Sequence, residues 1–127
     1  ALSYLICPLV NSQSVDNKIV QQGFDIIFNR NLGNCVTCHT VKSNSTHLVG
    51  NNEKQGNFAP DLSDVGNKYS RSELTQWVTD ARQIRPQTLM PPYGSLDMIA
   101  IPNQNKTLLT KDQIFSVVEA LVTLKRN

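Results

Sequence analysis

Apolar residues recur at helical spacing in the stretch that follows residue 14, with polar residues between them. One side carries Ile19, Val20, Gly23, Phe24, Ile26 and Ile27, and the other carries Asp16, Lys18, Gln21, Gln22 and Asp25. This period is typical of an amphipathic helix. It predicts a helix from about Val15 to Arg30, with Ser14 or Asp16 as its cap.

Two glycines qualify this first helix. Gly23 lies inside it, where glycine costs stability relative to alanine. We therefore predict that another helix packs closely against the chain at Gly23. Gly33 follows the end of the helix and suits a left-handed terminus there.

Two more helices are predicted by capping boxes, in which serine or threonine is followed three residues later by Glu or Gln. One box pairs Ser70 with Glu73, and the other pairs Thr110 with Gln113. Pro86 ends the first of these helices, because the residue before a proline disfavours helical backbone. The side chains predicted to be buried are Leu74, Trp77, Val78 and Ala81 in the first helix and Ile114, Val117, Val118, Leu121 and Leu124 in the second.

The segments between these helices are predicted to be loops. Turn-forming residues cluster from Thr40 to Gly66, and four prolines interrupt the stretch from Pro86 to Pro102. No strand pattern stands out, so the predicted fold class is all-α, with three main helices joined by long loops. Loops of this length need something to order them, and a cofactor that they wrap around would do so.

Composition and charge exclude several classes of protein. A chain of 127 residues with 39% hydrophobic residues has room for one domain with a modest core. The net charge of +2 comes without a basic block, so no nucleic-acid partner is expected. The aromatic share is only 6%, which leaves space in the core for a large planar cofactor.

The N-terminal run from Ala1 to Val10 is apolar but far shorter than the roughly 20 residues that cross a bilayer. No membrane span is predicted. We divide the chain into an N-terminal extension, residues 1–13, and a single domain, residues 14–127. Cys7 lies in the extension, and an idle thiol and an intermolecular link are both open interpretations of it.

The strongest chemical signal is the C-x-x-C-H motif formed by Cys35, Cys38 and His39. This is the attachment signature of c-type haem. Its spacing fits the chemistry, because two thiols three positions apart can each add to one vinyl group of the same haem. The imidazole that follows then reaches one face of the iron. Cys35, Cys38 and His39 are therefore candidate haem-binding residues.

Two other interpretations of the same motif fit less well. A zinc site would take His47 as its fourth ligand, but no second C-x-x-C or His pair completes a tetrahedral set. A thioredoxin-like dithiol would need a βαβ pattern around the motif, and none is present. Haem c remains the favoured cofactor.

The opposite face of the iron needs a ligand as well, and Met90 is the candidate. It precedes Pro91 and Pro92, which stiffen the loop and hold Met90 away from helical geometry. A thioether on a rigid loop suits a His/Met iron, whose reduction potential is raised by the sulfur. The competing interpretation is a core methionine. Met98 is predicted to be an apolar filler.

The proximal imidazole needs support from a second contact. His39 should donate its other ring N–H to a backbone carbonyl, and Pro60 is the best candidate for that acceptor. His47 is expected to be a solvated surface residue. Candidates for hydrogen bonds to haem propionates, each equally compatible with a surface or core role, are Tyr69, Trp77, Arg82, Arg85 and Tyr93.

With these residues in view, the chain resembles the class I c-type cytochromes and, among them, the SoxX family, the monohaem subunits of SoxAX thiosulfate-oxidising complexes. The resemblance covers about Gly23 to Leu124. Its most specific parts are Gly33 to His39, Ala59 to Gly66 and Asp80 to Tyr93. It implies the class I cytochrome c fold, with long loops wrapped around one covalently bound haem whose iron is held by His39 and Met90.

The resemblance also implies a function. The expected partner is a larger SoxA-like c-type cytochrome, at which thiosulfate is coupled oxidatively to a cysteine of a sulfur-carrier protein. This chain would take up the electrons and pass them to a soluble acceptor cytochrome, in the periplasm of a bacterium. It would be a non-catalytic subunit of an L-cysteine S-thiosulfotransferase. The alternatives are a stand-alone electron shuttle and, less favoured, a haem sensor or peroxidase.

Overall fold

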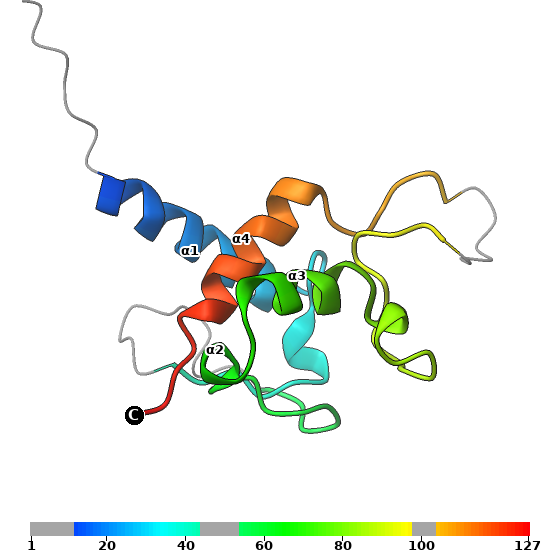
Figure 1. Cartoon of the computed structure of the whole chain (residues 1–127), viewed down its shortest axis with the longest axis horizontal. Helices are drawn as coiled ribbons and strands as arrows, with labels where there is room; N and C mark the ends of the chain where they lie inside the picture. Colours follow the sequence, from blue (N-terminus) through cyan, green and yellow to red (C-terminus); the bar gives the residue numbers. More distant parts are fainter. Residues whose placement is uncertain (1–11, 44–53, 98–103) are drawn as a thin grey trace, which may run out of the picture.

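The computed structural model describes residues 12–43, 54–97 and 104–127, and this part of the chain contains helices but no strands. The elements in order are α1 (Ser12–Phe28), η1 (Cys35–Thr37), α2 (Val65–Lys68), α3 (Arg71–Asp80), η2 (Ala81–Gln83) and α4 (Lys111–Val122). Figure 1 shows α1, α3 and α4 gathered together, with long loops below and beside them. The predicted all-α class with three main helices is confirmed.

The first helix differs from its prediction at both ends. It begins at Ser12, so the predicted caps Ser14 and Asp16 lie inside it, and it ends at Phe28 rather than Arg30. The left-handed residue after it is Asn34, with φ of 49°, and not Gly33. Asn is the residue besides Gly that tolerates this region most readily. The division of the chain after residue 13 stays a prediction.

Gly33 serves close packing instead of a left-handed turn. A Cβ atom at Gly33 would lie 2.6 Å from the carbonyl oxygen of Ile26. The Gly33 amide donates to that same oxygen at 3.1 Å. The prediction of a left-handed Gly33 is therefore wrong, and the residue is needed because the chain folds back onto the last turn of α1.

The crossing of α1 and α4 is the main helix contact, and Gly23 allows it. A Cβ atom at Gly23 would lie 1.9 Å from the backbone oxygen of Ser116 and 2.7 Å from the Cβ of Ala120. The predicted close approach of another helix is thus confirmed, with α4 as the partner. Around this crossing lies one hydrophobic core, which includes Phe24, Ile27, Val36, Val41, Leu74, Val78, Val117, Val118, Leu121 and Leu124.

Both capping boxes form as predicted. The Ser70 hydroxyl accepts from the Glu73 amide at the start of α3, and Thr110 and Gln113 repeat the arrangement at α4. The predicted inner faces are buried, except that Trp77 is only partly covered. Its ring lies edge-on to Tyr69, with centroids 6.4 Å apart.

The end of α3 is tied to the loop that follows. Asp80 is buried and accepts from the Arg82 guanidinium at 2.8 Å through each carboxylate oxygen. Arg82 also donates to the carbonyl of Asp97 at 2.6 Å. This bridge converts the end of α3 into η2 and fixes the start of the long loop that contains Met90.

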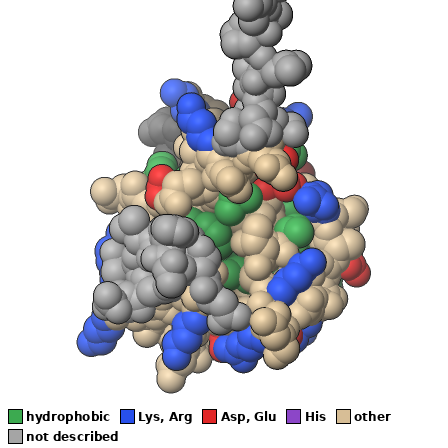
Figure 2. All heavy atoms as spheres, turned by 90° about the vertical axis from the view of Figure 1, so that its left-hand side faces the viewer, with side chains coloured by type: hydrophobic (Ala, Val, Ile, Leu, Met, Phe, Trp, Pro, Cys, Tyr) green, Lys and Arg blue, Asp and Glu red, His purple; other side chains and the backbone are tan. Residues whose placement is uncertain are grey.

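The surface is mixed in character. Figure 2 shows that on one face Lys and Arg side chains are spread around the margin, while apolar side chains reach the surface between them. Nucleic-acid-binding domains gather basic residues on one face, and this face does not. In the described part of the chain, the helices are all too short or too polar to span a membrane.

Candidate functional site

The C-x-x-C-H segment forms one tight turn. Cys35–Thr37 is a 3-10 helix, and the amides of Cys38 and His39 both donate to the Cys35 carbonyl, at 3.2 and 2.9 Å. Val36 is fully buried and anchors the turn in the core, while both cysteines remain partly exposed as free thiols. The turn therefore carries its two sulfurs and its imidazole on a single anchored loop.

The state of the thiols argues against a redox dithiol. Burial raises the pKa of Cys35 to about 12, although a backbone hydrogen bond acts in the opposite direction, and the nearby Cys38 raises it further. Reactive dithiols of the thioredoxin kind have lowered pKa values instead. Burial therefore favours the neutral form of the Cys35 thiol, unlike the thiolate of a reactive dithiol.

A zinc site receives no support either. Within the described residues, no group of three or more His, Cys, Asp or Glu side chains lies close enough to hold a metal ion. His47, the proposed fourth ligand, lies outside the described residues. Haem is the one cofactor among those considered whose donor set this segment supplies.

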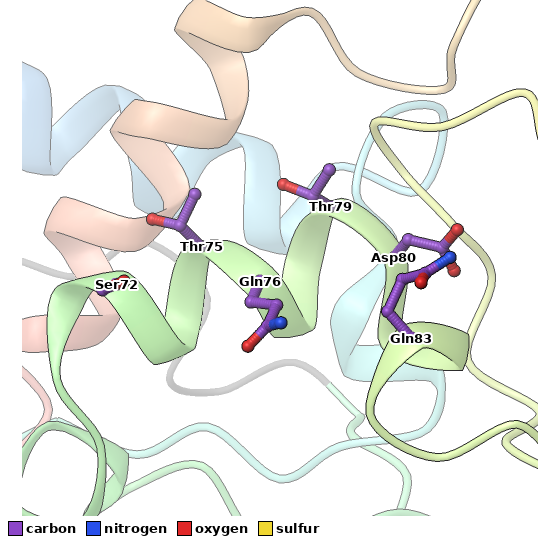
Figure 3. A pocket seen from close by; sticks show the side chains of 6 residues that line it. All are labelled: Ser72, Thr75, Gln76, Thr79, Asp80 and Gln83. Atoms are coloured by element: carbon purple, nitrogen blue, oxygen red, sulfur yellow. The ribbon is translucent and has the colours of Figure 1, made fainter.

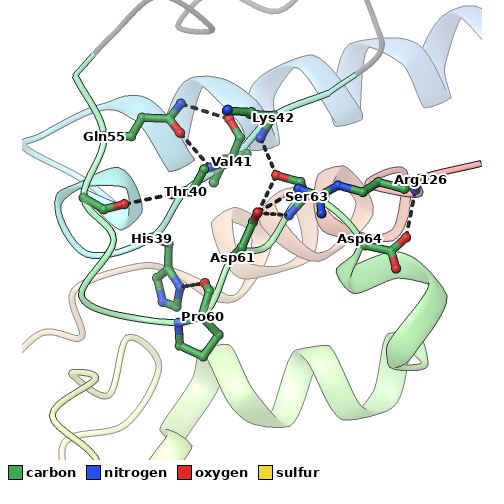
Figure 4. Close-up of polar contacts among 11 residues, drawn as sticks. His39, Thr40, Val41, Lys42, Gln55, Pro60, Asp61, Ser63, Asp64 and Arg126 are labelled. Atoms are coloured by element: carbon green, nitrogen blue, oxygen red, sulfur yellow. Dashed lines mark hydrogen bonds and ion pairs between the residues drawn. The ribbon is translucent and has the colours of Figure 1, made fainter.

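The ring of His39 is held by the loop that contains Pro60. The Nδ1 atom of His39 lies 2.6 Å from the Pro60 carbonyl oxygen (Figure 4). A carbonyl oxygen only accepts hydrogen bonds, so Nδ1 is the donor, and in the neutral ring Nε2 keeps its lone pair. His39 is therefore set in the tautomer that a metal ligand needs.

The Pro60 loop is itself bound along the haem-motif segment by a series of hydrogen bonds. The Gln55 side chain clasps the backbone of Val41, accepting at 2.7 Å and donating at 2.9 Å. The Gly56 amide donates to Val36 at 2.8 Å, and a Cβ at Gly56 would lie 2.1 Å from the Thr37 oxygen. The loop can therefore lie flat against the motif, and the Pro60 carbonyl has little freedom to move.

A second cluster anchors the far side of the same loop, as Figure 4 shows. The Ser63 hydroxyl donates to Asp61 at 2.5 Å and accepts from the Lys42 amide at 2.8 Å. Arg126 donates from its side chain to Asp61 at 2.7 Å and from its backbone to Asp64 at 2.8 Å. The C-terminal segment thus holds the loop that orients His39. We name Asp61, Ser63, Asp64 and Arg126 the C-terminal clasp.

The clasp gives stability a dependence on acid. The hydrogen bond from Ser63, together with Arg126, lowers the Asp61 pKa to about 2, whereas an unperturbed Asp titrates near 3.9. The stabilisation is therefore complete above about pH 4 and is lost as the pH falls toward 2.

We expect Asp61→Asn to be less stable than wild type at neutral pH, and to lose less stability than wild type between about pH 4 and pH 2. Denaturant titrations between pH 2 and 6 measure the free energy of unfolding at each pH, and Asp16→Asn, a change at an exposed carboxylate, is the control. Parallel curves for wild type and Asp61→Asn would contradict it.

Met90 lies in the loop that follows η2 and packs against the same hydrophobic core as Cys35. Its amide donates to the Thr88 hydroxyl at 3.2 Å. Three residues later, the buried Tyr93 donates its hydroxyl to the Gly33 carbonyl at 2.6 Å. The structure therefore joins the Met90 loop to the chain just before the haem motif. Met98 lies outside the described residues.

Two of the five candidates for propionate contacts, Tyr93 and Arg82, already bond elsewhere in the protein. Tyr93 is 8% exposed and uses its hydroxyl on Gly33, so it is unavailable for a propionate. Burial raises the pKa of Tyr93, with the Cys35 and Cys38 thiols adding to the effect. Arg82 is held by Asp80 and by the Asp97 carbonyl. Arg85 is exposed and remains a candidate.

The residues that support the Pro60 loop were not predicted from the sequence. Asp61 and Ser63 carry a local signal, because Asp followed two residues later by Ser is a common turn motif in which the side chain accepts from the backbone. Gln55 and Arg126 carry none. Their partners lie 14 residues and more than 60 residues away in the chain, so only the folded structure identifies them.

The surface also has an open hollow, which lies away from this site. It is lined by Ser72, Thr75, Gln76, Thr79, Asp80 and Gln83 on α3 and η2 (Figure 3). None of the candidate ligands borders it. Its lining is short and polar, and the one buried carboxylate, Asp80, already pairs with Arg82. We assign it no function.

Comparison with known proteins finds solved structures similar to this chain, and SoxXA from P. pantotrophus is among them. The chain superposes on SoxXA from P. pantotrophus with a TM-score of 0.72 and 29% sequence identity, covering 83% of this chain and 80% of the other. No family model matches the sequence, and no curated protein matches it either. The structural match confirms the resemblance to SoxX and the cytochrome c-like fold that the sequence predicted.

Proposed function

Because the chain is a SoxX-like cytochrome in fold, we propose that it is a monohaem c-type cytochrome and the electron-transfer subunit of a SoxAX-like complex. The observation that carries this proposal is the 2.6 Å hydrogen bond between His39 and the Pro60 carbonyl, next to two free thiols on one turn. This arrangement presents Nε2 as a ligand and two sulfurs for covalent attachment. It supports haem c better than zinc or a dithiol.

Each residue then has a defined part in binding the cofactor. Cys35 and Cys38 form the two thioether bonds, His39 supplies the proximal nitrogen, and Met90 supplies the distal sulfur. The haem contributes reversible one-electron exchange between ferric and ferrous iron. If His39 and Met90 both bind the iron, no ligand position would be left for a sulfur substrate, and this chain would not be catalytic alone.

The proposed reaction belongs to the partner. In a larger SoxA-like subunit, a carrier cysteine and the sulfane sulfur of thiosulfate form a sulfur–sulfur bond, and two electrons are released as the thiol proton leaves. A one-electron centre takes these electrons in two successive transfers. We propose that this chain receives them and passes them to a soluble acceptor cytochrome in the bacterial periplasm.

Two exposed apolar side chains that neighbour candidate site residues in the sequence favour a stable partner over a free shuttle. Phe58 is 74% exposed and lies two residues before Pro60, and Leu89 is 80% exposed and directly precedes Met90. Large apolar side chains exposed beside a redox centre favour a lasting protein interface, whereas transient shuttles dock through charged surfaces. The charge of +2 offers little for such steering.

Gentle purification of the holoprotein from periplasm tests this function. We expect a larger c-type cytochrome to co-elute in stoichiometric amounts. We expect Phe58→Ser with Leu89→Ser to reduce its recovery severalfold, because the proposed interface would lose its apolar side chains. Phe115→Ser is the matched control, since Phe115 is 53% exposed on α4. Elution of wild type as a lone, reducible monomer would instead support the stand-alone shuttle.

A further inference from the structure

Tyr93 makes hydrogen bonds with all its polar groups, and each one reaches a different segment. Its hydroxyl donates to Gly33 at 2.6 Å. Its amide donates to Val78 at 3.4 Å, and its carbonyl accepts from Leu109 at 2.9 Å. The ring is 8% exposed and belongs to the hydrophobic core. One residue therefore joins the end of α3, the segment before α4 and the chain just before the C-x-x-C-H turn.

The sequence before Tyr93 makes this attachment important for Met90. Pro91 and Pro92 have no amide hydrogen, so neither can donate a backbone hydrogen bond. After Met90, Tyr93 is thus the first residue whose backbone amide can donate a hydrogen bond, and it donates to Val78. The Gly94 amide adds a bond to Thr79 at 2.9 Å. Between Met90 and Tyr93, two proline rings restrict the backbone angles, so the position of Tyr93 limits where Met90 can lie.

The hydroxyl of Tyr93 has a further consequence. Gly33 directly precedes the left-handed Asn34 and the turn that carries Cys35, so its carbonyl is fixed relative to that turn. The bond from Tyr93 is buried, and removing it would leave that carbonyl unpaired in an apolar environment. The contact therefore fixes the distal loop relative to the proximal turn.

We propose that Tyr93 is a positioning residue that holds the Met90 sulfur in its axial position through the hydrogen bond to Gly33. This inference rests on the proposed His39 and Met90 ligation. Tyr93 does not touch the iron and acts only through the loop. Without the Tyr93 hydrogen bond, an added ligand displaces Met90 from the iron more easily. Covalent attachment through Cys35 and Cys38 is unaffected.

Imidazole binding to the ferric holoprotein tests the inference, because imidazole must displace Met90. We expect Tyr93→Phe to bind imidazole roughly 3- to 10-fold more tightly than wild type, as the loss of one hydrogen bond predicts. The reduction potential should fall as thioether ligation weakens. Thr123→Val, which removes a hydroxyl that donates to the Ala120 carbonyl at 2.6 Å at the end of α4, should alter neither value. A purely structural role for Tyr93 would lower the unfolding free energy but leave imidazole affinity unchanged, and that result would overturn the inference.

Two further measurements separate this inference from the proposed function. Met90→Ala should bind imidazole more tightly than Tyr93→Phe. If it matches wild type, the distal ligand assignment fails and the inference fails with it. Hydrogen exchange on the wild-type holoprotein gives a check that needs no variant. The amides of Tyr93, Gly94 and Leu109 should exchange as slowly as those in the middle of α4, and rapid exchange would contradict an anchor at Tyr93.

Discussion

Replacing Cys35 and Cys38 together by serine is expected to abolish covalent haem attachment. Serine hydroxyls do not form the thioether bonds that the two thiols supply at this turn, so no cofactor survives denaturation. The chain would then lack the group that its loops enclose, and we expect low yield as well as no redox activity. A denaturing gel stained for haem, with the intact mass of the chain, measures the result.

The single variants and Cys7 provide the controls. Cys35→Ser and Cys38→Ser should each retain at most one thioether bond and yield less holoprotein. Cys7→Ser should keep full haem content, because Cys7 lies outside the motif. A double variant that still carries covalent haem would refute the assignment. A wild-type chain with stoichiometric zinc and no haem would restore the zinc interpretation.

The second large effect is expected at the crossing of α1 and α4. Gly23→Ala places a Cβ atom where the Ser116 backbone oxygen would be only 1.9 Å away. The backbone cannot rotate aside as a flexible side chain would, so the helices must separate. Overpacking of this kind costs about 1–3 kcal/mol or more, and the better helix propensity of alanine returns about 1 kcal/mol. Because the approach of 1.9 Å is far below normal contact, we take the upper end of that range, about 3 kcal/mol, and expect a net loss of about 2 kcal/mol.

Thermal unfolding of the holoprotein measures this loss, which corresponds to a melting temperature lower by roughly 5–10 °C. Gln22→Ala is the control. It introduces alanine at an exposed position one residue away on the same helix, and it should leave stability unchanged or slightly higher. Equal melting temperatures for Gly23→Ala and wild type would mean that the helices separate at little cost and that the close crossing does not limit stability.

The sequence allowed prediction wherever the signal was local. Capping boxes at Ser70 and Thr110 depend on residues three positions apart, and both formed. The crossing at Gly23 was predictable because glycine in a helix interior needs a reason. In contrast, the chain reversal after α1 was assigned to Gly33 when Asn34 carries the positive φ. Gly33 and Asn34 are adjacent, and only the residues packed around them decide which one adopts the positive φ.

In the candidate site, too, local features were predictable and contacts between residues distant in sequence were not. The C-x-x-C-H motif was visible in the sequence as a local pattern, and the Pro60 carbonyl was named there as the best candidate acceptor for His39. The C-terminal clasp was not visible, since Arg126 and Asp61 are charged surface residues 65 positions apart. For Tyr93 a propionate contact and a core role were both left open, and the structure places it in the core, because a tyrosine in a proline-rich loop gives no sign of which carbonyl it will reach. Contacts distant in sequence are set by the packing of the whole core.

The C-terminal clasp also orders events in the making of the protein. Ribosomes build a chain from its N-terminus, so the C-x-x-C-H turn is complete long before Arg126 exists. Its own hydrogen bonds span only a few residues, whereas the contacts of Arg126 with Asp61 and Asp64 span more than 60. Such distant contacts form late in folding. The contacts of Arg126 with the Pro60 loop therefore close after the C-x-x-C-H turn has formed, so His39 gains its full support late in folding.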